Sequence, residues 1–217
     1  MTLRPLGPAL WLAEGPTIRG AAGFRFPTRM AILEAEDALV AGRPHPRPGR
    51  SRRAAGPGPA HHIASVLHRT WIGTWRDAAP DAILVGAPGV IDADLTVGDG
   101  PVPGHPDLEA VLFPNKIATE AVLLHAASRT VVFTDLVQQM PPGWYRGWRA
   151  IVARLDRMTG PEPAVPRKFR LATRDRPGAR AALARILNFA PQRLVAAHAP
   201  PIERDAKAHV ERLFAWL

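Results

Sequence analysis

The amino-acid sequence predicts a mixed fold of the α+β class that contains antiparallel strands. Short apolar runs separated by glycine and proline fill much of the first two thirds of the chain and are typical of strands. Apolar positions at helical spacing dominate the last third of the 217 residues. Residues 120–135 show the pattern of a β-hairpin, which a purely parallel, doubly wound sheet would not need.

The expected strands are compact apolar runs that end at turn residues. The hairpin folds about the sequence AASR, so that a strand lies on either side of it. The other strands are predicted at residues 9–14 (ALWLAE), 29–37 (RMAILEAED), 82–89 (AILVGAPG), 108–114 (LEAVLFP) and 193–198 (RLVAAH).

Four segments predict helices. Residues 70–80 form a short one, with Trp71 and Trp75 on one face. Residues 175–188 begin with Asp175 and carry Pro177 in the first turn, which is a typical helix start. Residues 144–158 place one apolar stripe opposite Arg146, Arg149 and Arg157; the stripe is Trp144, Trp148, Ile151, Val152, Leu155 and Met158. Residues 202–217 form the last helix, with Ala206, Val210, Leu213, Phe214 and Leu217 facing inward.

Residues 41–60 differ from the rest of the chain in composition. They hold five Arg, five Pro and four Gly, with no acid and nothing apolar larger than alanine. Such a segment cannot bury surface, so we expect a loosely packed or disordered loop within one domain that spans residues 1–217. It is either a genuine insertion or a segment translated out of frame. A basic arm for nucleic acid is the less favoured functional interpretation.

Composition limits the function classes. The chain has no cysteine, which excludes disulfides and thiolate-bound metals, leaves His, Asp and Glu as ligands and fits a reducing cytoplasm. No segment has the length and apolarity of a membrane span or a signal peptide, so we expect a cytoplasmic protein with no membrane partner. The net charge is +9, but it falls to +4 without the five arginines of residues 41–60.

Asp135, His198 and His68 are the candidate site residues. Asp135 ends the run TVVFT, His198 ends RLVAA, and His68 precedes the first predicted helix. Catalytic and ligand side chains often gather at strand ends, and two His with one Asp suit zinc, manganese or iron. Each has a purely structural alternative: Asp135 capping a helix that begins at Leu136, His198 bonding a turn carbonyl, and His68 lying exposed at a helix start.

Other polar residues are weaker candidates. His61 and His62 border the arginine-rich segment and are expected to be solvated. His125 is expected outside, at the hairpin tip. Asn115 and Lys116 either face a substrate or belong to a structural loop, which is the favoured interpretation.

Four stretches together resemble the bacterial family called domain of unknown function 4336, which is similar to a divergent branch of the metallo-β-lactamase-like superfamily. They are GFRFPTRMAILEAED, LHRTWIGTWRDAAPDA, SRTVVFTDLVQ and LVAAHAPPIERDAKAHVERLFAWL. The resemblance spans residues 9–40 and 61–217. It implies an αββα sandwich with a metal site along one edge of two sheets.

The resemblance also implies roles for single residues. Asp135 matches the superfamily's bridging aspartate, and His198 matches the histidine after the last strand. The superfamily's HxHxDH motif is absent, and Arg69 follows His68 where the family carries a second histidine. Since a guanidinium cannot ligate metal, the expected cofactor is at most one divalent ion, bound by His68, Asp135 and His198.

Three functions follow from these observations. The first is a metal-dependent hydrolase acting on a small molecule. The second is a catalytically inactive binding protein on the same fold, and the third, less favoured, is a nucleic-acid binder. Fold alone does not specify a substrate.

Overall fold

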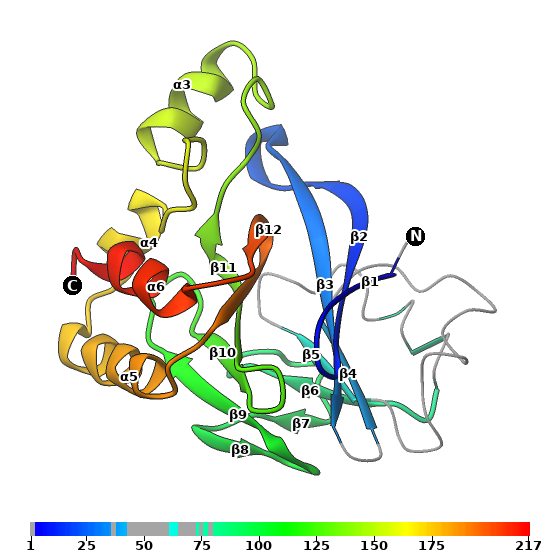
Figure 1. Cartoon of the computed structure of the whole chain (residues 1–217). Coiled ribbons are helices and arrows are strands. Elements are labelled where there is room, and N and C mark those ends of the chain that lie inside the picture. The colour runs from blue at the N-terminus through cyan, green and yellow to red at the C-terminus, as the bar shows by residue number, and fades with distance from the viewer. Residues whose placement is uncertain (1–2, 36–37, 43–60, 65–72, 74–75, 78–79) are drawn as a thin grey trace.

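The computed structural model describes residues 3–35, 38–42, 61–64, 73, 76–77 and 80–217. Its strands form two sheets, one of seven strands in the order β1-β2-β3-β4-β5-β6-β7 and one of five in the order β12-β11-β10-β9-β8 (Figure 1). The α+β prediction is therefore confirmed.

The seven-stranded sheet is antiparallel from β1 to β4 and parallel from β4 to β7. A short 3-10 turn, η1 (Ala21–Gly23), joins β2 to β3. The strands are β1 (Leu3–Gly7), β2 (Leu10–Arg19), β3 (Arg25–Ala35), β4 (Ala38–Gly42), β5 (His61–Ala64), β6 (Ile83–Gly86) and β7 (Leu95–Thr96).

The five-stranded sheet contains the predicted hairpin. Its strands are β8 (Gly100–Val102), β9 (His105–Phe113), β10 (Glu120–His125), β11 (Thr130–Gln138) and β12 (Arg193–Ile202). β8 to β11 are antiparallel neighbours, whereas β12 runs parallel to β11. The long connection between β11 and β12 carries α3 (Trp148–Leu155), α4 (Arg167–Ala172) and α5 (Arg176–Asn188), and α6 (Ala206–Phe214) follows β12.

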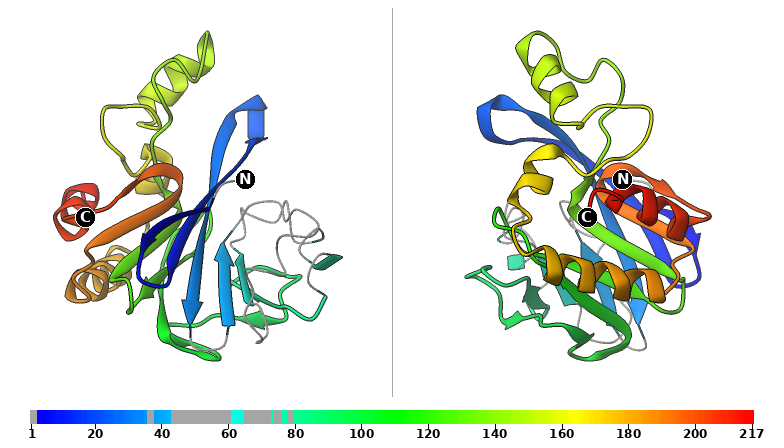
Figure 2. Two further views of the ribbon diagram at one scale, coloured as in Figure 1. Left: turned by 45° about the vertical axis from the view of Figure 1, so that its right-hand side comes forward. Right: turned by 90° about the vertical axis from the view of Figure 1, so that its left-hand side faces the viewer.

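Both faces of the five-stranded sheet are buried, in separate cores. Val131 and Phe133 of β11 point to the core shared with α5 and α6, while Val132 between them points to the core shared with the seven-stranded sheet. This alternation follows from the two-residue period of a strand. Figure 2 shows α5 and α6 lying across the outer face of this sheet. No helix within the described ranges is long and apolar enough to cross a membrane.

Most predicted elements are confirmed, with shifted ends. The predicted strands correspond to β2, β3, β6, β9, β10, β11 and β12, and Asp175 caps α5 by accepting a hydrogen bond from the Gly178 N–H at 2.9 Å. The elements that were not predicted are β1, β4, β5, β7, β8 and α4. The predicted α6 residues Ala206, Val210, Leu213 and Phe214 are buried.

Two expectations differ from the structure, and two others concern residues that lie wholly or mostly outside the described ranges. The helix expected at 144–158 spans only Trp148–Leu155, and the large apolar side chains within it are exposed. Ala41 and Gly42, expected in a loose segment, belong to β4, whereas residues 43–60 lie outside the described residues. Most of the helix expected at 70–80 also lies outside them.

Candidate functional site

Asp135 and His198 meet where two neighbouring strands lose their register. β11 and β12 pair regularly as far as Phe133 and Ala196, and pair again only at Gln138 and His198. Across this break, Nε2 of His198 lies 3.3 Å from Oδ1 of Asp135, and the two side chains are 2% and 11% exposed. The helix-capping alternative for Asp135 is wrong, since β11 continues through residues 136–138.

A backbone carbonyl orients the imidazole of His198. Its Nδ1 lies 2.7 Å from the carbonyl oxygen of Pro27 in β3, and the ring of Phe26 packs at 5.3 Å between centroids. A carbonyl only accepts, so Nδ1 carries the proton and donates it. Nε2 is thereby directed at Asp135, in the tautomer that a histidine metal ligand needs.

The carboxylate of Glu120 holds the backbone beneath Asp135. It accepts hydrogen bonds from the N–H groups of Thr134, Asp135 and Leu136 at 2.7, 2.9 and 2.9 Å. β11 pairs with β10 at Thr130, Val131 and Val132, so the three donors beyond them are satisfied by a side chain instead of a ladder. Glu120 therefore fixes the position from which the Asp135 side chain extends.

The environment of Glu120 is costly for a negative charge. Burial, and second the charge of Asp135, raise the pKa of Glu120 to about 7, although its three N–H donors act in the opposite direction. Sequence reasoning missed this residue. The signal was available, because Glu120 opens the apolar run AVLL as Asp135 interrupts TVVFTDLV.

Two further residues of β11, Thr134 and Gln138, carry polar side chains close to Asp135 in the sequence. Gln138 donates from Nε2 to the Asp135 carbonyl at 3.0 Å. The buried Oε1 of Gln138 and Oγ1 of Thr134 have no hydrogen-bond partner among the described residues. The main chain of Asp135 is thus held from both sides, by Glu120 and by Gln138.

Asp135 and His198 fit a metal ion in three respects. Carboxylate oxygen and imidazole nitrogen are both zinc ligands, and the tautomer of His198 is correct. Two ligand atoms about 2.0–2.1 Å from one tetrahedral ion lie roughly 3.3 Å apart, which is also the separation found here. Within the described ranges no group of three or more His, Cys, Asp or Glu forms a metal cluster. His68 lies outside the described residues, so its place in the set stays a prediction.

Two of the weaker sequence candidates, His125 and Asn115, have structural contacts. His125 was expected outside but is fully buried, with Nδ1 2.7 Å from the hydroxyl of Ser128. Asn115 is buried and donates to Phe169 O and Thr173 Oγ1 at 2.8 and 3.0 Å, as the structural interpretation predicts. His61 and His62 lie in β5.

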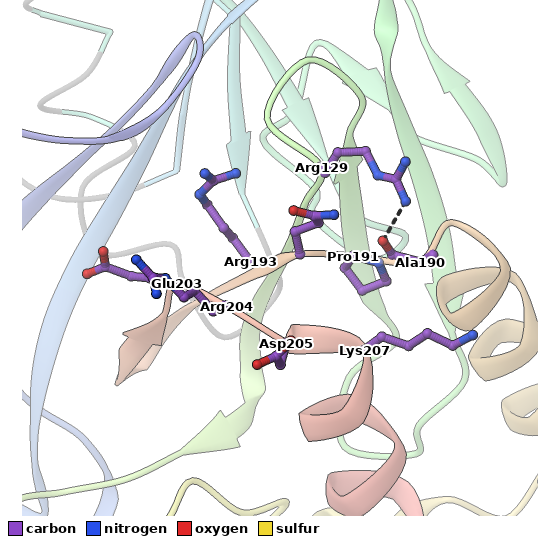
Figure 3. A pocket seen from close by; sticks show the side chains of 9 residues that line it. Arg129, Ala190, Pro191, Arg193, Glu203, Arg204, Asp205 and Lys207 are labelled. Atoms are coloured by element: carbon purple, nitrogen blue, oxygen red, sulfur yellow. Dashed lines mark hydrogen bonds between the residues drawn. The ribbon is translucent and has the colours of Figure 1, made fainter.

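A separate pocket of about 550 Å³ lies between the start of β12 and the start of α6 (Figure 3). Its charged lining is Arg129, Arg193, Arg204, Lys207, Glu203 and Asp205. Arg129 donates to the carbonyls of Phe189 and Ala190, and Arg193 donates to Ser128 O. Two of its cations therefore serve the fold, and Asp135, His198 and Glu120 do not line it.

Comparison with solved structures identifies the fold. The chain is similar to the DIM-1 metallo-β-lactamase exposed to ceftazidime, with 12% identity and a TM-score of 0.59 over 99% of this chain and 96% of that one. The FIM-1 metallo-β-lactamase from Pseudomonas aeruginosa in its mono-zinc form matches with 11% identity and a TM-score of 0.60, over 99% and 95%. A metallo-β-lactamase from Erythrobacter litoralis matches with 8% identity and a TM-score of 0.60, over 99% and 92%.

These likenesses establish the metallo-β-lactamase fold. No protein-family model matches the chain. No curated protein matches it either. The resemblance to domain of unknown function 4336 stays a prediction.

Proposed function

We propose that this protein is a metal-dependent hydrolase that holds one divalent ion (zinc, manganese or iron) at Asp135 and His198, with His68 as a further ligand. The observation that carries the proposal is the 3.3 Å approach of His198 Nε2 to Asp135 Oδ1 on a metallo-β-lactamase fold. The mono-zinc form of the FIM-1 enzyme is a precedent for a single ion on this fold.

The described residues have distinct tasks in this proposal. His198 offers a neutral nitrogen held by Pro27 O, and Asp135 offers a negative oxygen that balances the charge of a cation. Glu120 keeps the Asp135 backbone in place through three N–H groups. A divalent ion bound there would act as a Lewis acid that polarises a carbonyl or phosphoryl oxygen and acidifies water.

Metal content tests the site. Purified wild-type protein is expected to contain, or to take up from solution, no more than one zinc per chain by elemental analysis and calorimetric titration. Asp135→Asn and His198→Gln are expected to reduce the affinity at least tenfold, because each removes one ligand. His209→Gln, a change to a histidine of α6, is the matched control and should bind as the wild type does. Two tightly bound ions per chain would contradict the single-ion proposal.

Hydrolysis tests the activity. A panel of chromogenic esters, phosphodiesters and β-lactams is assayed with and without a chelator, and cleavage must disappear with the chelator and in both ligand variants. Zinc binding with no cleavage of any substrate would instead support an inactive binding protein on this fold. Retention on nucleic acid that weakens steeply with salt would support the third candidate.

A further inference from the structure

Helix α3 exposes its large apolar side chains and buries its small one. Trp148, Ile151, Val152 and Leu155 are 52%, 64%, 43% and 58% exposed, although their spacing puts them on one stripe. The buried residue of this helix is Ala153. A surface helix of a globular protein has the opposite arrangement, so this stripe is built to contact something outside the described fold.

The exposed stripe rests on a firmly attached helix. Arg149 donates from Nε to Ala22 O at 2.9 Å. Its guanidinium carbon lies 4.5 Å from the centroid of the Trp148 ring. The rings of Trp148 and Phe24 meet edge to face, with 5.7 Å between their centroids. Just before the helix, the Tyr145 hydroxyl donates to Arg25 O at 2.7 Å. The tip of the β2–β3 hairpin thus fixes α3, and the stripe is not the product of a loose segment.

The surroundings of the stripe are almost wholly cationic. Residues 141–160 contain four arginines, Arg146, Arg149, Arg154 and Arg157, and one acid, Asp156. The carboxylate of Asp156 already forms an ion pair, since its Oδ2 lies 3.1 Å from Lys168 Nζ. The cationic character continues to α4, where burial and then the charges of Arg157 and Arg167 lower the pKa of Arg170.

The position of α3 suits contact with a flat surface. In Figures 1 and 2 the helix lies at one end of the molecule, beside the tip of the β2–β3 hairpin. A plane at this end of the molecule could therefore reach α3 while most of both sheets stays away from it.

We propose that α3 docks this protein reversibly onto a lipid surface that contains anionic phospholipids. An apolar stripe with a Trp, flanked by arginine, is the arrangement of a helix lying in the interface of a bilayer. A second copy of the chain is a poor occupant, because it would bring the same arginines against these. An anionic headgroup layer offers opposite charge to the exposed arginines near the stripe, such as Arg154. Such docking concerns the surface of a membrane and needs no spanning segment.

Vesicle flotation of the full-length protein tests the proposal. Wild-type protein should float with phosphatidylcholine vesicles that contain phosphatidylglycerol, and not with pure phosphatidylcholine vesicles, and high salt should weaken the binding. Ile151→Ser combined with Leu155→Ser should reduce the partition coefficient at least tenfold. Arg154→Glu should reduce it at least fivefold, since each arginine contributes roughly a factor of five.

The controls separate docking from damage. Ile91→Ser changes an apolar residue that is 79% exposed but lies in the loop between β6 and β7, and it should bind as the wild type does. All variants should keep the wild-type melting temperature, because the replaced side chains are exposed. No binding to phosphatidylglycerol vesicles, or equal binding by the stripe variants, would overturn the proposal. A wild-type dimer that the double serine variant converts to a monomer would also overturn it, in favour of a second copy on the stripe.

Discussion

His198 Nε2 lies 3.3 Å from Asp135 Oδ1, between two parallel strands that have lost their pairing. Nδ1 of the same ring donates to the carbonyl of Pro27. A neutral His198 therefore presents a lone pair, not a proton, to a negative oxygen. Either a second proton on the ring or a cation between the two atoms removes this conflict.

Zinc should stabilise the folded protein through this pair. A ligand that binds only the folded state adds about 2.7 kcal/mol at a hundred times its dissociation constant. We expect calorimetry to show a raised melting temperature with zinc, reversed by chelator, and no rise in Asp135→Asn. The same rise in both proteins would place the ion elsewhere.

Glu120→Ala should be among the most destabilising single changes in the molecule. It leaves the N–H groups of Thr134, Asp135 and Leu136 without their acceptor, and each unsatisfied buried group costs about 1–3 kcal/mol. We expect a loss of at least about 3 kcal/mol in urea unfolding. Glu109→Ala is the matched control, since Glu109 forms an exposed ion pair with Arg185 of the kind that contributes about 1 kcal/mol or less. Equal losses would show that Glu120 has no special role.

The pKa of Glu120 predicts how stability depends on pH in metal-free protein. Its folded value of about 7 exceeds its ordinary value of 4.5, so between these limits the folded state binds more protons than the unfolded one. The stabilisation that Glu120 contributes is fully present below pH 4.5 and is lost as the pH rises toward about 7. At about 1.4 kcal/mol per pKa unit the loss is roughly 3 kcal/mol.

Urea titrations at a series of pH values measure this slope. Glu120→Gln cannot ionise and should lose it, in addition to being less stable at every pH. Glu162→Gln alters an exposed carboxyl and should keep the slope. A slope that survives in Glu120→Gln would assign it to another group.

Sequence reasoning succeeded where the local pattern and the tertiary structure agree. Asp135 and His198 were singled out because each ends an apolar strand, and the adjacency of β11 and β12 brings them together. The α5 start was predicted from Asp175, whose cap is a contact between near neighbours. Such signals are contained in a few consecutive residues.

The failures concern information that no short window holds. The pattern of α3 shows an apolar stripe but not whether a core exists beside it, and only the structure shows that four residues of the stripe are exposed. His125 follows the run AVLL at a predicted turn, yet Ser128 and the sheet bury it. Glu120 depends on donors fourteen to sixteen residues away, which only the hairpin register brings to it.

Asn115→Ala should reduce stability and leave the metal site intact. Asn115 joins the end of β9 to α4: its amide donates to Phe169 O and Thr173 Oγ1, and its Oδ1 accepts from the Ile117 N–H at 3.0 Å. Truncation removes three buried or partly buried hydrogen bonds, so we expect a loss of about 2–4 kcal/mol in urea unfolding.

The neighbouring Lys116→Ala is the control for Asn115→Ala. The Lys116 side chain is exposed, and its backbone bond to Ala172 O survives the change, so stability should stay within about 0.5 kcal/mol of the wild type. Zinc should raise the melting temperature equally in both variants and in the wild type, because neither side chain is one of the proposed ligands. Unchanged stability in Asn115→Ala together with a weakened zinc response would reverse the assignment and make Asn115 part of the site.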